Sequence, residues 1–180
     1  MPAPHALPDI LAALETNARE IESYFAGLSR ATFFSGNEHE WGPAEHLSHL
    51  THAHERVARG FAAPEKLPPH ERGRSRLFAE VCATYETRLA QVPAEQLRQN
   101  PLPPRLAAGV TQAEVVRAFA GASAKMRAAA GAWSEADCDS RAMPHPFLGW
   151  LSAREMLLFF VHHDRLHLAG VRRRIEAGAK

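Results

Sequence analysis

The segment over residues 152–178 constrains the fold most, because it has the pattern of one long amphipathic helix. Its apolar side chains recur at spacings of three and four residues, the period of a helix face that is buried in a core. The predicted buried face comprises Met156, Phe159, Phe160, His163, His167 and Val171. Two histidines therefore continue an apolar stripe and are predicted to point into the protein. A capping box, Ser152-x-x-Glu155, marks the start of this helix.

The rest of the chain shows the same helical period in four further segments. These segments are residues 7–28, 43–61, 74–92 and 111–130. Segments rich in proline and glycine separate them, among them residues 62–73 and the extended connector at residues 100–104. No segment has the alternation of a β-strand. The predicted fold class is therefore all-α: a four-helix bundle, most simply antiparallel, with an additional short helix or turns.

Length and charge limit the classes of protein that this chain can belong to. With 180 residues, we expect a single domain that spans residues 1–180. The chain has 21 basic and 20 acidic residues and a net charge of +1, so no overall field favours nucleic acid. There is no apolar run long enough for a membrane span and no leader sequence, and the two cysteines are far apart. We therefore expect a cytoplasmic protein with no membrane partner.

The histidines are the strongest functional signal. Nine of the eleven fall in two windows, residues 39–54 and 145–167. His163 and His167 are four residues apart, so on a helix they differ by only about 40° around the axis and both can reach one point. A divalent metal ion is the usual occupant of such a point. The alternative is a core hydrogen-bond network of histidines without a metal.

Periodicity alone does not choose a third ligand from the first window. The apolar stripe of the helix over residues 43–61 places His54 nearest its centre, His46 next, and His49 toward its border. His39 and His52 are expected in solvent. In the second window, His162 is an alternative to His163, although it lies about 100° from the stripe and makes no i, i+4 pair with His167.

Two stretches resemble the DinB/YfiT-like superfamily of small bacterial metal-binding helix bundles. They are residues 41–50 (WGPAEHLSHL) and residues 144–167 (PHPFLGWLSAREMLLFFVHHDRLH). The resemblance implies a four-helix bundle in which one histidine of the second helix and two of the last helix bind a divalent metal. By position these are His49, His163 and His167. His46 and His54 would then pack around the ligands or donate hydrogen bonds to them.

Three imidazoles leave a divalent ion at least one open position, as in catalytic rather than structural zinc sites. Such an ion can produce hydroxide near neutral pH or activate a thiolate. The resemblance implies both metal-dependent hydrolysis and chemistry that uses a low-molecular-weight thiol. The alternative is a stress-related metal- or ligand-binding protein without turnover.

The remaining expectations concern the residues and molecules around the ion. Asp164 and Glu45 are interpreted as surface or capping carboxylates, so no catalytic residue is assigned. We expect zinc or nickel as the metal, since imidazole suits both. The partner is expected to be a small-molecule substrate or thiol, and a homodimer is compatible with the spare apolar surface of a small bundle.

Overall fold

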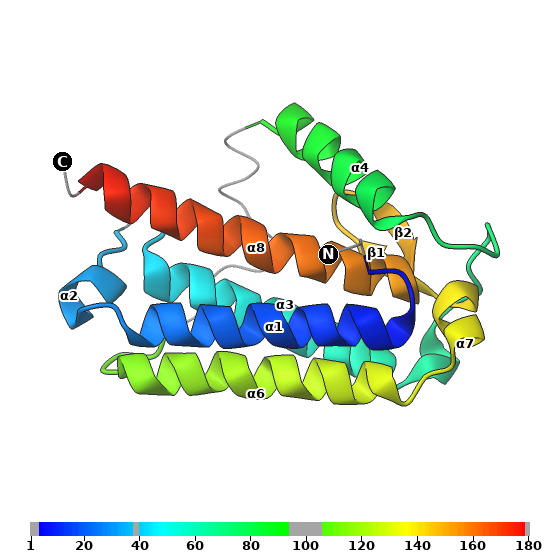
Figure 1. Ribbon diagram of the computed structural model, residues 1–180, viewed down its shortest axis with the longest axis horizontal. Helices are drawn as coiled ribbons and strands as arrows, with labels where there is room; N and C mark the ends of the chain where they lie inside the picture. The colour runs from blue at the N-terminus through cyan, green and yellow to red at the C-terminus, as the bar shows by residue number, and fades with distance from the viewer. Residues whose placement is uncertain (1–3, 38–39, 94–105, 179–180) are drawn as a thin grey trace.

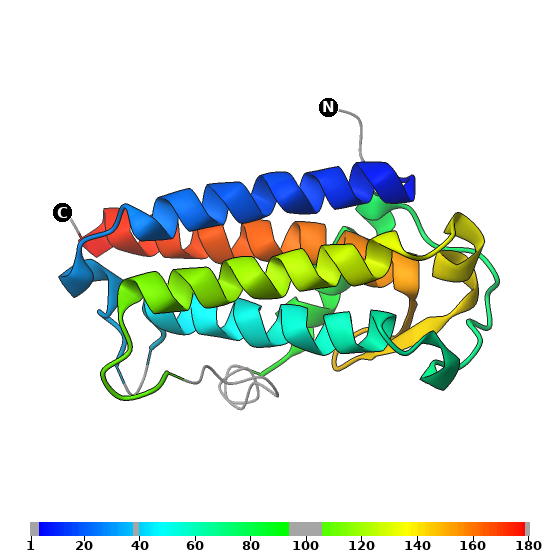
Figure 2. The same ribbon diagram turned by 90° about the horizontal axis from the view of Figure 1, so that it is seen from below.

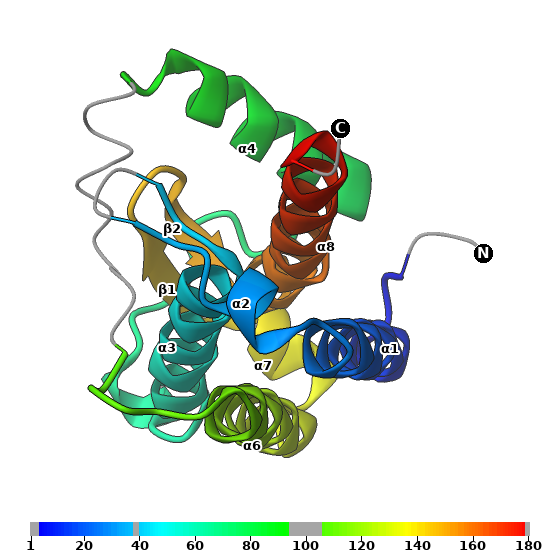
Figure 3. The same ribbon diagram turned by 90° about the vertical axis from the view of Figure 1, so that its left-hand side faces the viewer.

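Four long helices form the body of the protein in the computed structural model, which describes residues 4–37, 40–93 and 106–178 (Figure 1). They are α1 (Leu7–Ala26), α3 (Pro43–Phe61), α6 (Gln112–Gly131) and α8 (Ala153–Gly178). Seen end-on, they occupy the four corners of a bundle, and α4 (Phe78–Gln91) lies outside it against α8 (Figure 3). The predicted all-α bundle with an additional helix is therefore confirmed.

The helix directions differ from a purely antiparallel bundle. The helices α1 and α8 run in one direction, whereas α3 and α6 run in the other (Figures 1 and 2). A parallel neighbour cannot be reached by a tight turn. The chain between α3 and α6 is accordingly long and contains α4, which lies beside α8.

The predicted helix boundaries agree closely with those observed, because the capping signals act as expected. The backbone N–H of Gly42 donates to Glu45 Oε2 (2.9 Å) at the start of α3, with Pro43 as the first helical residue. At α6, Thr111 N–H donates to Glu114 Oε2 (2.8 Å). The helix α4 is shorter than its predicted range of 74–92, and the connector at residues 100–104 lies outside the described residues.

Short elements occupy segments that were predicted to be loops. They are α2 (Arg30–Phe33), the 3-10 helix η1 (Pro64–Lys66), α7 (Glu135–Ser140), β1 (Ala142–His145) and β2 (Gly149–Ser152). The strands pair antiparallel, from Ala142 opposite Ser152 to His145 opposite Gly149. The prediction that the chain has no strand is therefore wrong here, because strands of four residues are too short to show alternation. Gly149 has φ 69°, a left-handed conformation that favours glycine at the end of the hairpin loop.

A buried carboxylate fixes the start of α8 to the segment that leads into α4. Glu155 is fully buried, and its Oε1 accepts from the backbone N–H (2.8 Å) and Nε (3.0 Å) of Arg76. Ser152 Oγ accepts from the N–H of Glu155 (3.0 Å), which completes the predicted capping box. These contacts hold α4 over one side of the bundle. No helix in the described part of the chain is long and apolar enough to cross a lipid bilayer.

We predict that Glu155→Ala lowers the free energy of unfolding by about 3 kcal/mol, because it leaves a partly buried arginine without its partner. Urea denaturation followed by circular dichroism measures the change. The control is Glu20→Ala, which removes an ion pair between half-exposed side chains with Arg172 (2.8 Å) and should cost less than about 1 kcal/mol. Equal costs for the two variants would contradict the anchoring role of Glu155.

Candidate metal centre

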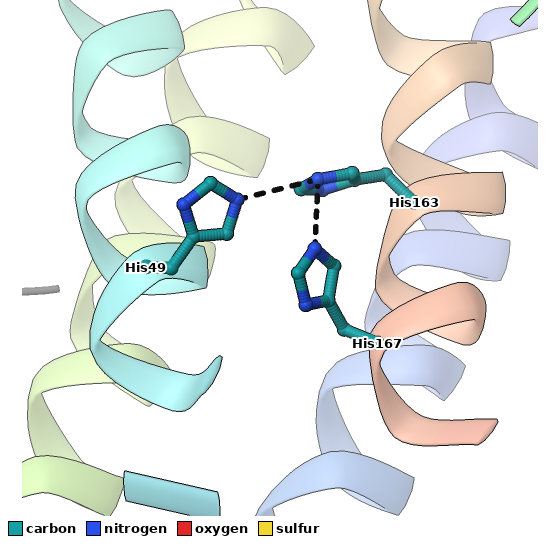
Figure 4. A group of neighbouring side chains, drawn as sticks. All are labelled: His49, His163 and His167. Carbon is teal, nitrogen blue, oxygen red and sulfur yellow. Dashed lines mark hydrogen bonds between the residues drawn. The ribbon is translucent and has the colours of Figure 1, made fainter. Parts of the chain in front are cut away.

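The side chains of His49, His163 and His167 converge between α3 and α8 (Figure 4). The Nε2 atom of His163 lies 3.1 Å from Nε2 of His167 and 3.4 Å from Nε2 of His49. One nitrogen atom from each ring lies within 4.8 Å of the others. The structure thus brings together the three histidines that the resemblance selected.

The spacing of these nitrogen atoms fits a tetrahedral metal ion. With metal–nitrogen bonds of about 2.0–2.1 Å, two ligands of such an ion are separated by about 3.3 Å. The Nε2 separations of His163 from His167 and from His49, 3.1 and 3.4 Å, lie on either side of this value. The donor set is also suitable, since imidazole is a good ligand for zinc, nickel, copper and iron. The residues present therefore fit a divalent ion.

The ring of His167 is held by a second histidine. Its Nδ1 lies 2.8 Å from Nδ1 of His46, so one of these two nitrogens carries the proton that joins them. Trp41 packs on His46 and His49, with ring centroids 5.5 and 5.2 Å apart. The contact leaves Nε2 of His167 to face the cluster, and outer partners of this kind fix the orientation of metal-binding rings.

Burial keeps these imidazoles neutral. The pKa of His163 and that of His167 lie well below the usual 6.5, first because burial disfavours the charged ring and then because the neighbouring histidines repel a proton. Burial, with smaller contributions from His49 and Arg174, lowers the pKa of His46 to about 4. Neutral rings have a free lone pair, which is the form that binds a metal.

The other histidines of the two windows do not join the cluster. His54 Nε2 is hydrogen-bonded to Asp164 Oδ1 (2.9 Å), and both side chains are fully buried. His162 Nε2 lies 3.3 Å from Glu86 Oε1 of α4. His52 is half-buried rather than in solvent, and His39 lies outside the described residues.

Of the two carboxylates weighed from the sequence, one behaves as expected and one does not. Glu45 caps α3, as its position predicted. Asp164 is completely buried, so its interpretation as a surface carboxylate is wrong. Histidine and arginine flank it in the sequence, a pattern typical of a polar surface. The structure instead provides a buried partner, His54 on α3, which the periodicity of a single helix cannot reveal.

An apolar cleft of about 390 Å³ adjoins the cluster, and the three histidines form part of its wall. Its other walls come from α3, α4, α8 and the hairpin. They comprise His46, Ala53, Arg56, Val57, Tyr85, Leu89, Pro144, His145, Pro146, Phe147, Met156, Phe159 and Phe160. Sequence reasoning did not assign the residues from α4 and the hairpin to the site, because no spacing rule relates these segments to α3 and α8.

Comparison with known proteins agrees with this geometry. A model of the DinB superfamily matches residues 13–170, which include all three clustered histidines and most of the chain. No curated protein and no solved structure matches the chain. The matched span includes α3 and α6 in full, most of α1 and α8, and the residues of the cleft. The chain therefore belongs to the DinB superfamily.

Proposed function

We propose that the protein is a metal-dependent enzyme, either a hydrolase or a low-molecular-weight-thiol S-transferase. His49, His163 and His167 hold a divalent ion, zinc or nickel. The observation that carries the proposal is that three convergent imidazole nitrogens also line an apolar cleft. A cleft of about 390 Å³ is within the range of small-molecule sites. The alternative, a stress-related metal- or ligand-binding protein, does not require turnover.

The residues around the ion have separate tasks. An ion with three protein ligands keeps exchangeable positions, at which it can polarise a carbonyl or lower the pKa of a thiol or water. His46 orients His167 through the contact between their Nδ1 atoms. The buried rings of Phe159 and Tyr85 bind the apolar part of a substrate and keep water from the reacting groups.

The proposal extends to the setting of the protein. We infer one domain over residues 1–180 that acts on a small molecule in the cytoplasm, where the free thiols of Cys82 and Cys138 stay reduced. The exposed Trp150 and Leu77 provide apolar surface that a homodimer could bury. Neither nucleic acid nor a membrane is part of the proposal.

We predict that Ala at position 49, 163 or 167 lowers metal affinity more than roughly 100-fold, since loss of an outer partner alone costs about 10–100-fold. His46→Ala should fall in that smaller range. His52→Ala is the matched control on α3 and should bind metal normally. Elemental analysis and competition with a chelator measure stoichiometry and affinity, and circular dichroism checks the helix content. Full stoichiometry in His49→Ala would move the third ligand to His46 or His54.

We predict that metal affinity changes little between about pH 8 and pH 6 and falls at lower pH. The sign follows from the depressed pKa values of His163 and His167. A free imidazole takes up a proton near pH 6.5, whereas these rings do so only in more acidic solution. Protons therefore compete with the metal for the ring nitrogens only at lower pH. Competition titrations with a chelator of known pH dependence measure the profile. An affinity that is unchanged down to pH 3 would contradict histidine ligation.

We predict turnover that depends on the metal. The metal-loaded protein should react in a screen of small thiols with electrophiles or of esters and amides, and His163→Ala and chelated protein should be inactive. Turnover that survives chelation would contradict the metal mechanism. No turnover from a metal-loaded, folded protein across the screen would favour the binding-protein alternative.

A further inference from the structure

The cleft carries a pair of hydrogen-bond donors apart from the three proposed ligands. These are Arg56 of α3 and His145 of β1, and no acidic side chain of the described residues lines the cleft. The rest of the wall, apart from His46, is made of apolar and aromatic residues, including Tyr85. A cation and a donor that line the same apolar cleft form a place where a negatively charged group can bind.

The hairpin fixes which nitrogen of His145 carries the proton. Its Nδ1 accepts from the backbone N–H of Phe147 (3.2 Å) and of Leu148 (3.1 Å), so Nδ1 is unprotonated. Burial, and then the positive charge of Arg56, lowers the pKa of His145 to about 4. At neutral pH the ring is therefore uncharged and its remaining nitrogen, Nε2, carries the hydrogen and acts as a donor.

Arg56 supplies the charge that His145 lacks. Its side chain is exposed, and the described residues give its guanidinium no hydrogen bond or ion pair. Other arginines near the cleft region are paired, for example Arg76 with Glu155. An arginine without a carboxylate partner at the wall of a cleft is available for an anionic ligand.

Phe159 contacts both His145 of this donor pair and the proposed metal ligand His163. Its ring centroid lies 4.4 Å from that of His145 and 4.9 Å from that of His163, so one aromatic ring lies against both polar regions. A ligand that touches both regions must therefore have an apolar body about the size of a ring over Phe159. Its two polar ends must lie on opposite sides of that body.

We propose that the substrate of this cleft is an amphipathic carboxylic acid whose carboxylate binds Arg56 and His145 while its reactive group reaches the three-histidine cluster. The position of the reactive end rests on the proposed function. The carboxylate site does not require a bound metal. Arg56 and His145 are thus specificity-determining residues.

The test uses 4-mercaptophenylacetate and its neutral methyl ester as probes, with binding measured by calorimetry on metal-free and cobalt-loaded protein. The acid should bind roughly tenfold more tightly than the ester in both forms, because a charge-assisted contact is lost in the ester. The Arg56→Gln variant should bring the ratio of affinities close to one, and His145→Phe should lower it about threefold. Arg59→Gln, an exposed arginine one turn along α3 and outside the cleft, should keep the full ratio.

The outcomes separate this proposal from the proposed function. A sulfur-to-cobalt absorption band on adding the acid reports that the thiol reaches the metal, independently of the ratio. Absence of the band from cobalt-loaded protein, with the ratio retained, would overturn the position of the reactive end and leave the carboxylate site standing, whereas failure to load cobalt would count against the metal assignment. Equal affinities for acid and ester in the unmodified protein, or equal effects of Arg56→Gln and Arg59→Gln, would overturn the carboxylate site. That first comparison needs no variant, so poor folding of His145→Phe would not affect it.

Discussion

The burial of imidazoles between α3 and α8 is the constraint on which the rest of the structure depends. Elsewhere the bundle helices meet through apolar side chains such as Phe25, Phe119 and Leu157, and the buried Asn17 of α1 donates to the backbone carbonyl of Val161 in α8 (2.9 Å). At the contact between α3 and α8 each ring needs a hydrogen-bond donor, an acceptor or a metal ion as its partner, because an unpaired polar group costs a few kcal/mol when buried. Nδ1 of His167 pairs with Nδ1 of His46, and Nε2 of His54 pairs with Asp164 Oδ1. The three facing Nε2 atoms complete the arrangement as a site that suits a cation.

The elements outside the bundle convert this contact into a cleft. The helix α4, held by Glu155, and the hairpin, shaped by Gly149, bring Tyr85 and His145 to the side of the site that the four helices leave uncovered. Their rings pack on Phe159, with centroids 4.9 and 4.4 Å away. The bundle thus positions the proposed ligands, whereas the added elements determine what else can touch a molecule bound there.

Much of this was predictable because helices carry their signals locally. Capping motifs and the 3.6-residue period predicted the bundle helices, and the i, i+4 spacing predicted that His163 and His167 reach one point. Periodicity could not select His49, because it ranks positions by distance from the centre of an apolar stripe. The observed site faces a neighbouring helix, so its ligand lies at the border of the stripe, and only the resemblance indicated it. The Asp164–His54 pair, the hairpin and the contribution of His145 depend on contacts between distant segments, which no local pattern encodes.

The same geometry links metal binding to the stability of the fold. The clustered imidazoles do not take up protons near neutral pH, because burial and the neighbouring histidines lower the pKa of His163 and of His167. A cation that binds the folded chain and not the unfolded chain stabilises it by mass action. On the proposed assignment, the ion would therefore join α3 to α8 at the contact where apolar packing is replaced by polar groups. That ion would offset the cost of burying the three rings.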